Sequence, residues 1–422
     1  MKRTLGGLTT RGRSFVAAGV TAIVCAFALG ERDLLRAGVL VLALPLLSSL
    51  VVSRTRYRLA CARRLDPPRL SVGHEARVDL RLENVSRLPG GLLLVEDRVP
   101  YTLGGRARFV LDRIEPHGSR ELSYRVRSDV RGRYQVGPLT VRLADPFGLV
   151  ELVRSFSLAD RLTVTPPLVE LPPGRLMGGW TGGGDSLART VANAGEDDVA
   201  PREYRHGDDL RRVHWRATAR RGELMVRREE RHWQSSGTLF LDTRRHAYAG
   251  EGPAGSFEQA VSIAASLGVH LSRAGMGLRF VTDAGQVLSP SAAFEGALLD
   301  ALAVVHPSTV RSLTPGLAAM GGAAGPGREG EGLVIAVFGV LDAQEAQALA
   351  AARRGTSTYV AILVDPRADP AAGGGAGGGT GRTARLLRAA GWRVAVVGSA
   401  AGLAAAWTAA DQAAEESARG RS

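Results

Sequence analysis

Two long apolar runs open the chain. Residues 14–29 are all apolar or small, and residues 34–52 form a second run after a turn of only four residues. A helix needs about 20 apolar residues to cross a bilayer, so both runs approach the spanning length. The pattern therefore predicts a transmembrane hairpin with helices at about residues 14–30 and 34–52.

The charges around the hairpin predict its orientation. Residues 1–64 hold eleven Lys or Arg against Glu31 and Asp33, a net +9 of the chain's formal +13. Both outer flanks are basic and the connecting turn is nearly neutral. The positive-inside rule then places both ends in the cytoplasm. We expect a multi-pass protein of the cell membrane whose N-terminus and soluble domains are cytoplasmic.

Two alternatives to a membrane anchor fit the sequence less well. A cleaved signal peptide fits poorly, because no small-x-small cleavage site leads into a polar mature chain and a second apolar run follows at once. A buried hairpin in a soluble protein is the other alternative. It is disfavoured because the runs lack the polar face of a surface helix.

Residues 65–172 alternate apolar and polar positions over short runs. Period two is the signature of strands with one buried face. Turn sequences such as Asp145-Pro146-Phe147-Gly148 separate the runs at the spacing of an antiparallel sandwich. We predict an Ig-like β-sandwich. Its expected strands are 76–82, 91–99, 107–111, 121–126, 139–143, 149–156 and 161–164.

The last part of the chain, residues 237–422, follows a segment of linker and motif at 173–236. Its apolar runs are short and nearly continuous, as in strands buried on both faces, and helical segments separate them. This predicts a doubly wound α/β domain. The expected strands are 238–241, 278–282, 333–338, 359–364 and 393–397; the expected helices are 257–273, 292–305, 343–353, 383–390 and 401–414. Residues 314–332 and 371–381 are Gly- and Ala-rich and are predicted to be loops.

Composition narrows the possible chemistry. The two cysteines, Cys25 and Cys61, build neither a disulfide framework nor a CxxC site, and the eight histidines lack metal-ligand spacing. Outside the membrane flanks the net charge is only +4, spread over some 358 residues. That excess is too dilute for a surface that tracks phosphates. We expect no cofactor and no nucleic-acid partner.

Residues 195–231 form the densest motif of the chain. Gly207 supplies a turn, Asp208 can cap a short helix over 210–220, and Gly222 suits the left-handed position after it. A strand is expected at 223–226. The motif can be a docking surface, or its Arg and Asp residues can pair and hold a loop against the sheet. Its candidate docking or structural residues are Arg202, Tyr204, Gly207, Asp208, Asp209, Arg211, Arg212, His214, Trp215, Arg216 and Arg220.

These residues, at this spacing, resemble the signature of the DUF58 family. The resemblance extends to the hairpin, the β region with its Asp-Pro-Phe-Gly turn, and the α/β domain. It implies a membrane-anchored protein with a von Willebrand factor A-like domain. It also implies work with a MoxR-type AAA+ ATPase in protein assembly or maturation.

A von Willebrand factor A-like domain often binds a divalent cation through an Asp-x-Ser-x-Ser loop after its first strand. Here that loop begins at Asp242, and Arg244 and His246 replace both hydroxyl residues. A guanidinium repels a hard cation that needs oxygen ligands. We therefore expect a degenerate loop that binds no metal, with Asp242 paired to Arg244 or Arg245.

Three functions remain open at this point. The leading hypothesis is a non-enzymatic membrane adaptor or scaffold that presents its A-like domain to the ATPase. A metal-dependent phosphodiester hydrolase would draw on the arginine-rich motif. A structural envelope protein would self-associate through the β-sandwich as a homo-oligomer.

Overall fold

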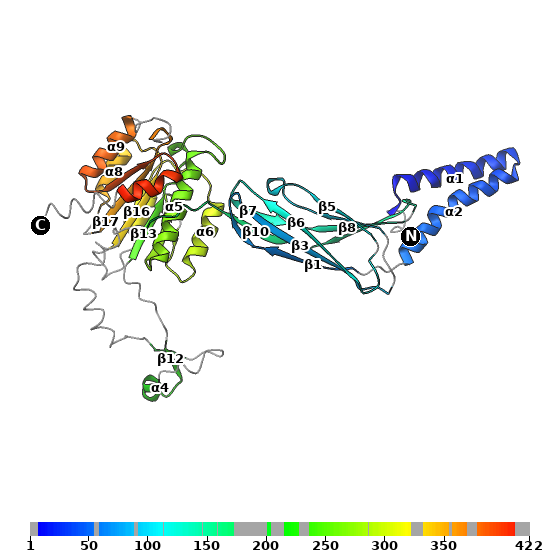
Figure 1. Ribbon diagram of the computed structural model, residues 1–422, viewed down its shortest axis with the longest axis horizontal. Coiled ribbons are helices and arrows are strands. Elements are labelled where there is room, and N and C mark those ends of the chain that lie inside the picture. Colours follow the sequence, from blue (N-terminus) through cyan, green and yellow to red (C-terminus); the bar gives the residue numbers. More distant parts are fainter. Residues whose placement is uncertain are drawn as a thin grey trace. The chain divides into compact units, whose positions relative to one another are not determined.

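The computed structural model describes residues 7–54, 59–87, 92–112, 114–145, 147–157, 159–172, 201–203, 215–227, 236–285, 287–321, 332–353, 357–368 and 378–409. The chain divides into two compact units, Met1–Pro166 and Pro167–Ser422. Figure 1 shows helices and antiparallel strands in the first unit, and a sheet between helices in the second.

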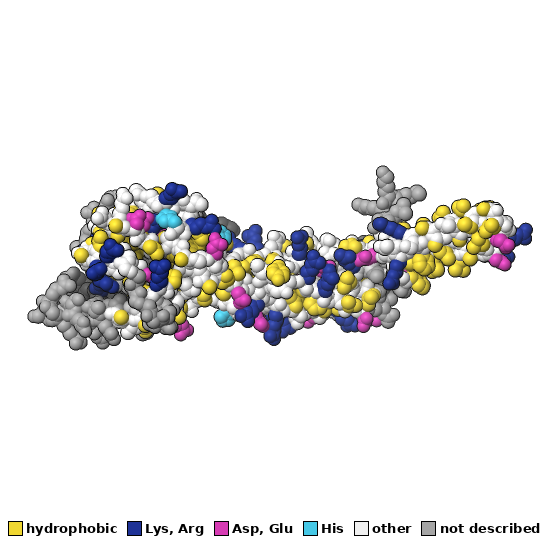
Figure 2. Space-filling model, turned by 90° about the horizontal axis from the view of Figure 1, so that it is seen from above, with side chains coloured by type: hydrophobic (Ala, Val, Ile, Leu, Met, Phe, Trp, Pro, Cys, Tyr) yellow, Lys and Arg dark blue, Asp and Glu magenta, His cyan; other side chains and the backbone are white. Residues whose placement is uncertain are grey.

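The first unit begins with two antiparallel helices, α1 (Thr10–Leu29) and α2 (Arg32–Arg54). Both are long and apolar enough to cross a membrane, and Figure 2 shows apolar side chains along their surface. They pack closely because small residues lie between them. A Cβ on Gly19 would lie 3.0 Å from Cβ of Leu42, and one on Gly38 would lie 2.9 Å from Cγ1 of Ile23.

The two predicted helices are confirmed, with different bounds. The first helix starts at Thr10 rather than residue 14, because the Thr9 hydroxyl accepts the Gly12 N–H and caps it. The helix ends where Gly30 adopts φ +72°, a conformation that suits glycine. The second helix extends past residue 52 to Arg54. Apolar runs locate the hydrophobic stretch, whereas caps determine where a helix begins.

The rest of the first unit is β-sheet. One sheet has the order β1-β3-β6, a second β5-β4-β8-β9, and a third β2-β10-β7. Neighbouring strands are antiparallel except β2 and β10, which are parallel. The strands are β1 (Leu59–Asp66), β2 (Arg69–Ser71), β3 (Glu75–Asn84), β4 (Leu93–Asp97), β5 (Ala107–Leu111), β6 (Ser119–Arg127), β7 (Gly132–Val136), β8 (Leu139–Ala144), β9 (Glu151–Phe156) and β10 (Asp160–Thr165).

Alternation along the strands builds the core of these sheets. In β3 every second residue is buried, so Leu80 and Leu82 pack with Leu93 and Val95 of β4 from the second sheet. Val78, on the same face of β3, packs instead with strands of the third sheet. The β-sheet region predicted from period two is confirmed.

One charged cluster is enclosed in these sheets. Arg63 on β1 donates from Nη2 to Asp97 at 2.7 Å and from Nη1 to Asp160 at 3.3 Å. The Tyr124 hydroxyl donates to Asp97 at 2.6 Å. Burial, together with this hydrogen bond to the carboxylate, raises the pKa of Tyr124. The Arg63 and Asp97 side chains are 1% and 0% exposed, so the buried Asp97 carboxylate depends on Arg63 for its charge balance.

The second unit contains a sheet of the order β15-β14-β13-β16-β17-β18, parallel except for β15. Its strands are β13 (Ser236–Leu241), β14 (Gly277–Thr282), β15 (Val287–Leu288), β16 (Gly332–Phe338), β17 (Thr358–Val364) and β18 (Arg393–Val397). Its helices include α5 (Ser256–Arg273), α6 (Phe294–Val304), α7 (Thr314–Gly321), α8 (Ala343–Ala351) and α9 (Gly378–Ala389), and a further helix follows β18 at 403–409. A separate piece has α4 (Trp215–Arg221) and the antiparallel pair β11 (Pro201–Glu203) and β12 (Met225–Arg227).

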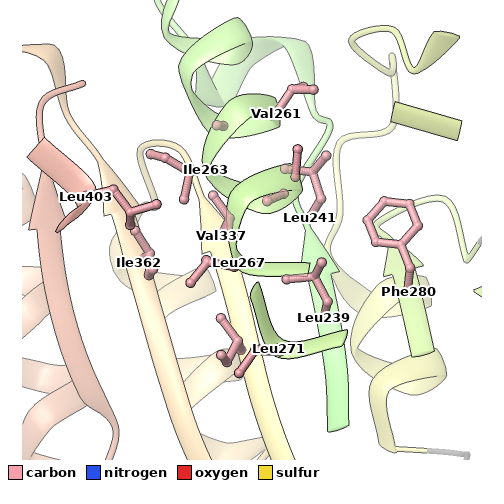
Figure 3. Packing of buried hydrophobic residues seen from close by; sticks show 14 of the residues in the cluster. Leu239, Leu241, Val261, Ile263, Leu267, Leu271, Phe280, Val337, Ile362 and Leu403 are labelled. Atoms are coloured by element: carbon pink, nitrogen blue, oxygen red, sulfur yellow. The ribbon is translucent and has the colours of Figure 1, made fainter. Parts of the chain in front are cut away.

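Helices cover both faces of this sheet. Leu239 and Leu241 of β13 pack with α5 and α6 on one face, where Figure 3 shows them against Leu267 and Val337. Phe240 points to the other face, which α7, α8 and α9 cover. Two buried faces explain the continuous apolar runs in the sequence. The predicted parallel α/β sheet is confirmed.

The structure corrects the predicted loop at residues 314–332. Its first eight residues form α7, which begins at Thr314 with proline at the second position. Arg279 of β14 donates to the carbonyls of Ala319 and Met320, both at 3.0 Å, in the last turn of α7. This tertiary contact stabilises a helix that the Gly- and Ala-rich composition does not predict. The predicted loop at 371–381 is likewise shortened, because α9 begins at Gly378.

Candidate functional site

The carboxyl edge of the parallel sheet gathers the polar groups of the second unit. The chain passes from β13 to β14 on one side and later to β16 on the other, so its direction reverses between β13 and β16. Ligands of open α/β sheets bind at such a switch point. Asp242 and Arg244 follow β13, Asp283 follows β14, and Glu345 lies in the first turn of α8.

The Arg244 guanidinium occupies the centre of this edge. Its Nε and Nη2 donate to the two carboxylate oxygens of Asp242, each at 2.9 Å, and its Nη1 donates to Glu345. The side chains of Arg244 and Asp242 are both 0% exposed. Burial alone would lower the pKa of Arg244, but the hydrogen bonds and charges of Asp242 and Glu345 outweigh it and raise that pKa. The guanidinium is therefore a fixed, charged part of the interior.

Neighbouring residues donate hydrogen bonds to other acceptors at this edge. The Asp283 carboxylate accepts from the Thr243 backbone N–H and hydroxyl, and from the Ser308 hydroxyl at 2.7 Å. The Tyr248 hydroxyl donates to the carbonyl of Asp242 at 2.7 Å. Burial, and next the Asp242 charge, raise the pKa of Tyr248 well above its usual value. Donors and acceptors here pair with one another rather than pointing into open space.

Glu345 is held by its own helix as well. Asp342 and Glu345 form a capping box: the Asp342 carboxylate accepts the Glu345 N–H at 2.7 Å, and the Glu345 carboxylate accepts the Asp342 N–H at 3.0 Å. The ion pair with Arg244 thus ties the start of α8 to the end of β13. His246 lies on the exposed side, with Nε2 3.4 Å from Nη1 of Arg244.

This arrangement bears on the expected cation loop. Asp242 was expected to pair with Arg244 or Arg245, and in the structure it pairs with Arg244. Arg245 is exposed, and its Nη2 lies 3.7 Å from Oε1 of Glu251. A metal ion at Asp242 would have to displace a bidentate guanidinium. Across the part of the chain that the structure describes, no group of three or more His, Cys, Asp or Glu side chains is placed to hold a metal.

We expect magnesium or manganese to leave the stability of this protein unchanged. Both carboxylate oxygens of Asp242 already accept from Arg244, so neither is free to replace water around a hard cation. Binding at a hundredfold excess over Kd would raise the free energy of unfolding by about 2.7 kcal/mol. Thermal unfolding with MgCl₂, MnCl₂ or EDTA measures this, and a clear rise with either metal would contradict the expectation.

The structure places only part of the motif at 195–231. Arg202 lies in β11, opposite Val226 of β12. Trp215 begins α4 with 72% of its surface exposed, and Arg220 is exposed in the last turn. Arg216 also lies in α4. Outside the described residues are Tyr204, Gly207, Asp208, Asp209, Arg211, Arg212 and His214.

The local expectations for this motif are met where they can be compared. The helix predicted over 210–220 appears as α4 from Trp215, and Gly222 follows it at φ +75°. The Thr218 hydroxyl accepts the Met225 N–H at 3.0 Å, which holds β12 against α4. Met225 is buried, so this helix and strand form a small packed piece with an exposed tryptophan.

The model of the family described as "Protein of unknown function DUF58" matches residues 200–373. Over these residues the chain is similar to the DUF58 family. The match covers most of the motif, the switch-point edge and the strands β13 to β17, so the resemblance predicted from the motif is confirmed. Among curated proteins none matches the chain.

Three of the solved structures that are similar to this chain cover about a quarter of it. The CARDB domain of the PF1109 protein from Pyrococcus furiosus is 14% identical, with 26% of this chain and 90% of that chain covered and a TM-score of 0.20. A putative ApaA protein from Bordetella pertussis is 11% identical, with 25% of this chain and 92% of that chain covered and a TM-score of 0.20. A beta-glucosidase from Listeria innocua is 13% identical, with 26% of this chain and 16% of that chain covered and a TM-score of 0.16.

Sequence reasoning missed three members of the switch-point cluster: Asp283, Ser308 and Glu345. A signal existed for two of them. Asp283 comes directly after the predicted strand 278–282, at the same edge as Asp242. The spacing of Asp342 and Glu345 before an apolar run is that of a capping box, which places both at a helix start. Ser308 has no such signal, because it reaches Asp283 from an irregular segment.

Proposed function

We propose that this protein is a membrane-anchored, non-enzymatic adaptor or scaffold. Its α1–α2 hairpin would hold an Ig-like β-sandwich and a von Willebrand factor A-like domain at the cytoplasmic face of the cell membrane. There it would serve a MoxR-type AAA+ ATPase in protein assembly or maturation. The orientation follows from the basic flanks of the hairpin, and the ATPase from the family resemblance.

The observation that carries this proposal is the exposed Trp215 in the DUF58 motif. A tryptophan at 72% exposure loses the hydrophobic stabilisation that burial gives, and Arg220 and Arg221 are exposed on the same short helix. Trp and Arg are the residue types most enriched among those that dominate protein interfaces. A surface with both is suited to a protein partner with an apolar pocket and acidic rim.

The state of the switch-point edge supports an adaptor over a hydrolase. Hydrolysis of a phosphodiester by a metal enzyme needs a cation with an open coordination position. At this edge the Asp242 carboxylate is taken up by the buried Arg244, which Glu345 also contacts. The same ion pairs make this edge a rigid support, on which loops can present a binding surface.

Binding of the ATPase tests the proposal. We expect Arg211→Ala, Arg212→Ala and Arg216→Ala together to weaken the association at least about tenfold, and more strongly at low salt. Trp215→Ala should weaken it by a similar factor but with little dependence on salt. Full-length protein in detergent and the purified ATPase, measured by biolayer interferometry, give both values.

A matched control removes the same charge elsewhere. Arg382, Arg385 and Arg388 are all exposed on α9, so replacing these three by Ala also lowers the net charge by three. This control should bind the ATPase as the unmodified protein does. If both triple variants lost the same binding affinity, the change in net charge alone would explain the loss. Normal binding by the motif variant would mean that the docking surface lies elsewhere.

A further inference from the structure

The turn between β8 and β9 is bonded to the start of the first membrane helix. The Thr9 N–H donates to the carbonyl of Leu149 at 3.0 Å, and the Thr9 hydroxyl donates to the carbonyl of Gly148 at 2.7 Å. Leu8 also pairs with Val150 as an isolated antiparallel bridge. Gly12 lies so close that a Cβ there would sit only 2.2 Å from the Leu149 carbonyl oxygen.

The described residues of the turn are bonded to one another. The Asp145 carboxylate accepts the N–H groups of Val150 at 2.8 Å and Phe147 at 3.3 Å, and the Asp145 carbonyl accepts the N–H of Gly148 at 3.0 Å. Gly148 has φ +67°, where a side chain would be strained. The turn nevertheless presents Phe147 with 63% of its surface exposed. Phe147 belongs to neither hydrophobic cluster of these sheets.

Both ends of the hairpin lead to this end of the β-sheets. The α2 helix ends at Arg54 and β1 begins at Leu59, which pairs with Asn84 at the end of β3. The next residue, Val85, is 46% exposed. Leu92 directly precedes β4 and is 52% exposed. The first residue of β4, Leu93, pairs with Leu143 of β8, which lies two positions before the turn. Three exposed apolar side chains, Val85, Leu92 and Phe147, therefore belong to the end that faces the hairpin.

Basic residues accompany them. Arg11 and Arg13 lie in the first turn of α1, and Nη1 of Arg11 lies 3.9 Å from where a Cβ on Gly148 would be. Aromatic side chains gather at the boundary between lipid and water, and basic side chains beside a membrane helix bind anionic headgroups. The same two residue types meet where α1 would leave the bilayer.

We propose that the Asp145–Val150 turn is seated on the bilayer surface, with Phe147 in the interfacial region and Arg11 and Arg13 among anionic lipid headgroups. The partner of this surface is lipid rather than protein. The inference rests on the membrane anchoring in the proposed function, and it adds a second attachment. The hydrogen bonds from Thr9 then fix the β-sheets to the membrane, instead of leaving them on a free tether.

Depth-dependent quenching tests this seating. In full-length protein with Cys25→Ala and Cys61→Ala, Phe147→Cys carries an NBD fluorophore, and the protein is placed in phosphatidylcholine and phosphatidylglycerol vesicles. An amphipathic group at the interface lies about 5–10 Å below the headgroup boundary, so a shallow doxyl lipid should lower the NBD emission roughly twofold. Omitting phosphatidylglycerol should weaken this quenching.

Tyr101→Cys is the matched control. Tyr101 is also an exposed aromatic residue, at 94%, and it follows the opposite end of β4. Its NBD label should be unaffected by the doxyl lipid. Equal quenching at both positions, or none at position 147, would overturn the inference.

Flotation of the same vesicles separates the two proposals. Protein that floats without quenching at position 147 leaves the anchor intact and refutes only the seated turn. Protein that does not float refutes the anchor and the seated turn together. ATPase binding in detergent depends on neither result.

Discussion

Replacing Arg244 by methionine should lower the free energy of unfolding of the α/β unit by about 3–5 kcal/mol. Methionine is close in length but has no charge, so the Asp242 carboxylate would remain at 0% exposure without its bidentate partner. Removing one member of a buried ion pair costs this much because the other charge stays desolvated. Glu345 would lose its contact with β13 as well.

Tryptophan fluorescence measures this change in the right unit. All five tryptophans lie after residue 167, and Trp392 and Trp407 are buried in the second unit. Arg245→Met is the matched control, because Arg245 is the next residue and is 73% exposed. Its effect should stay within about 0.5 kcal/mol. Equal transitions for the two variants would show that the buried pair does not stabilise the unit.

The loss in Arg244→Met should grow with pH. Burial raises the pKa of Asp242, and the hydrogen bonds and charge of Arg244 oppose that rise. Without Arg244 the folded-state pKa rises further above the unfolded value of about 3.9. A raised carboxyl pKa means that the folded state binds the proton more tightly. The variant is therefore closest to the unmodified protein below about pH 4, and it loses stability as pH rises, by at most about 1.4 kcal/mol per unit.

The pH series has its own control. Arg245→Met, followed over the same pH range, reports the titration of the rest of the unit. The difference between the two variants should widen from acid to neutral pH. A constant difference would mean that Asp242 keeps its charge without Arg244, and that water reaches it.

Hydrophobic pattern predicted most of the fold because burial has a period. The parallel strands and α5 were predicted to within two residues, since continuous apolar runs and a helical stripe leave few alternatives. The start of α7 and the early start of α9 were missed. Both lie in Gly- and Ala-rich sequence, where helix formation depends on contacts such as those of Arg279 with Ala319 and Met320.

The candidate site was predictable only in part. The expectation that Arg244 opposes cation binding follows from its charge beside Asp242. That the guanidinium lies inward and pairs with both Asp242 and Glu345 does not follow from the sequence, because Glu345 in α8 is 101 positions away from Arg244. Side-chain direction at a strand end is set by tertiary contacts. The exposure of Trp215 is of the same kind, because the sequence marks Trp215 as a docking or structural residue without showing whether its side chain is covered.

Replacing Arg63 by methionine should destabilise the first unit by a similar amount, about 3–5 kcal/mol. Asp97 would remain buried with the Tyr124 hydroxyl as its neutral partner, and Asp160 and the Val136 carbonyl would lose their hydrogen bonds from Nη1. Arg63 lies in β1, the strand that follows the α1–α2 hairpin. Its loss should therefore loosen the start of the β-sheet region.

The two buried arginines give reciprocal tests, because they lie in different units. Arg63→Met should leave the tryptophan transition unchanged, since the first unit has no tryptophan, while hydrogen exchange of β3 and β6 peptides should accelerate. Arg244→Met should do the opposite. Arg64→Met, at the exposed neighbouring position on β1, should change neither signal. If Arg63→Met shifted the tryptophan transition as well, the two units would unfold as one, and stability lost in the first unit would also be lost in the second.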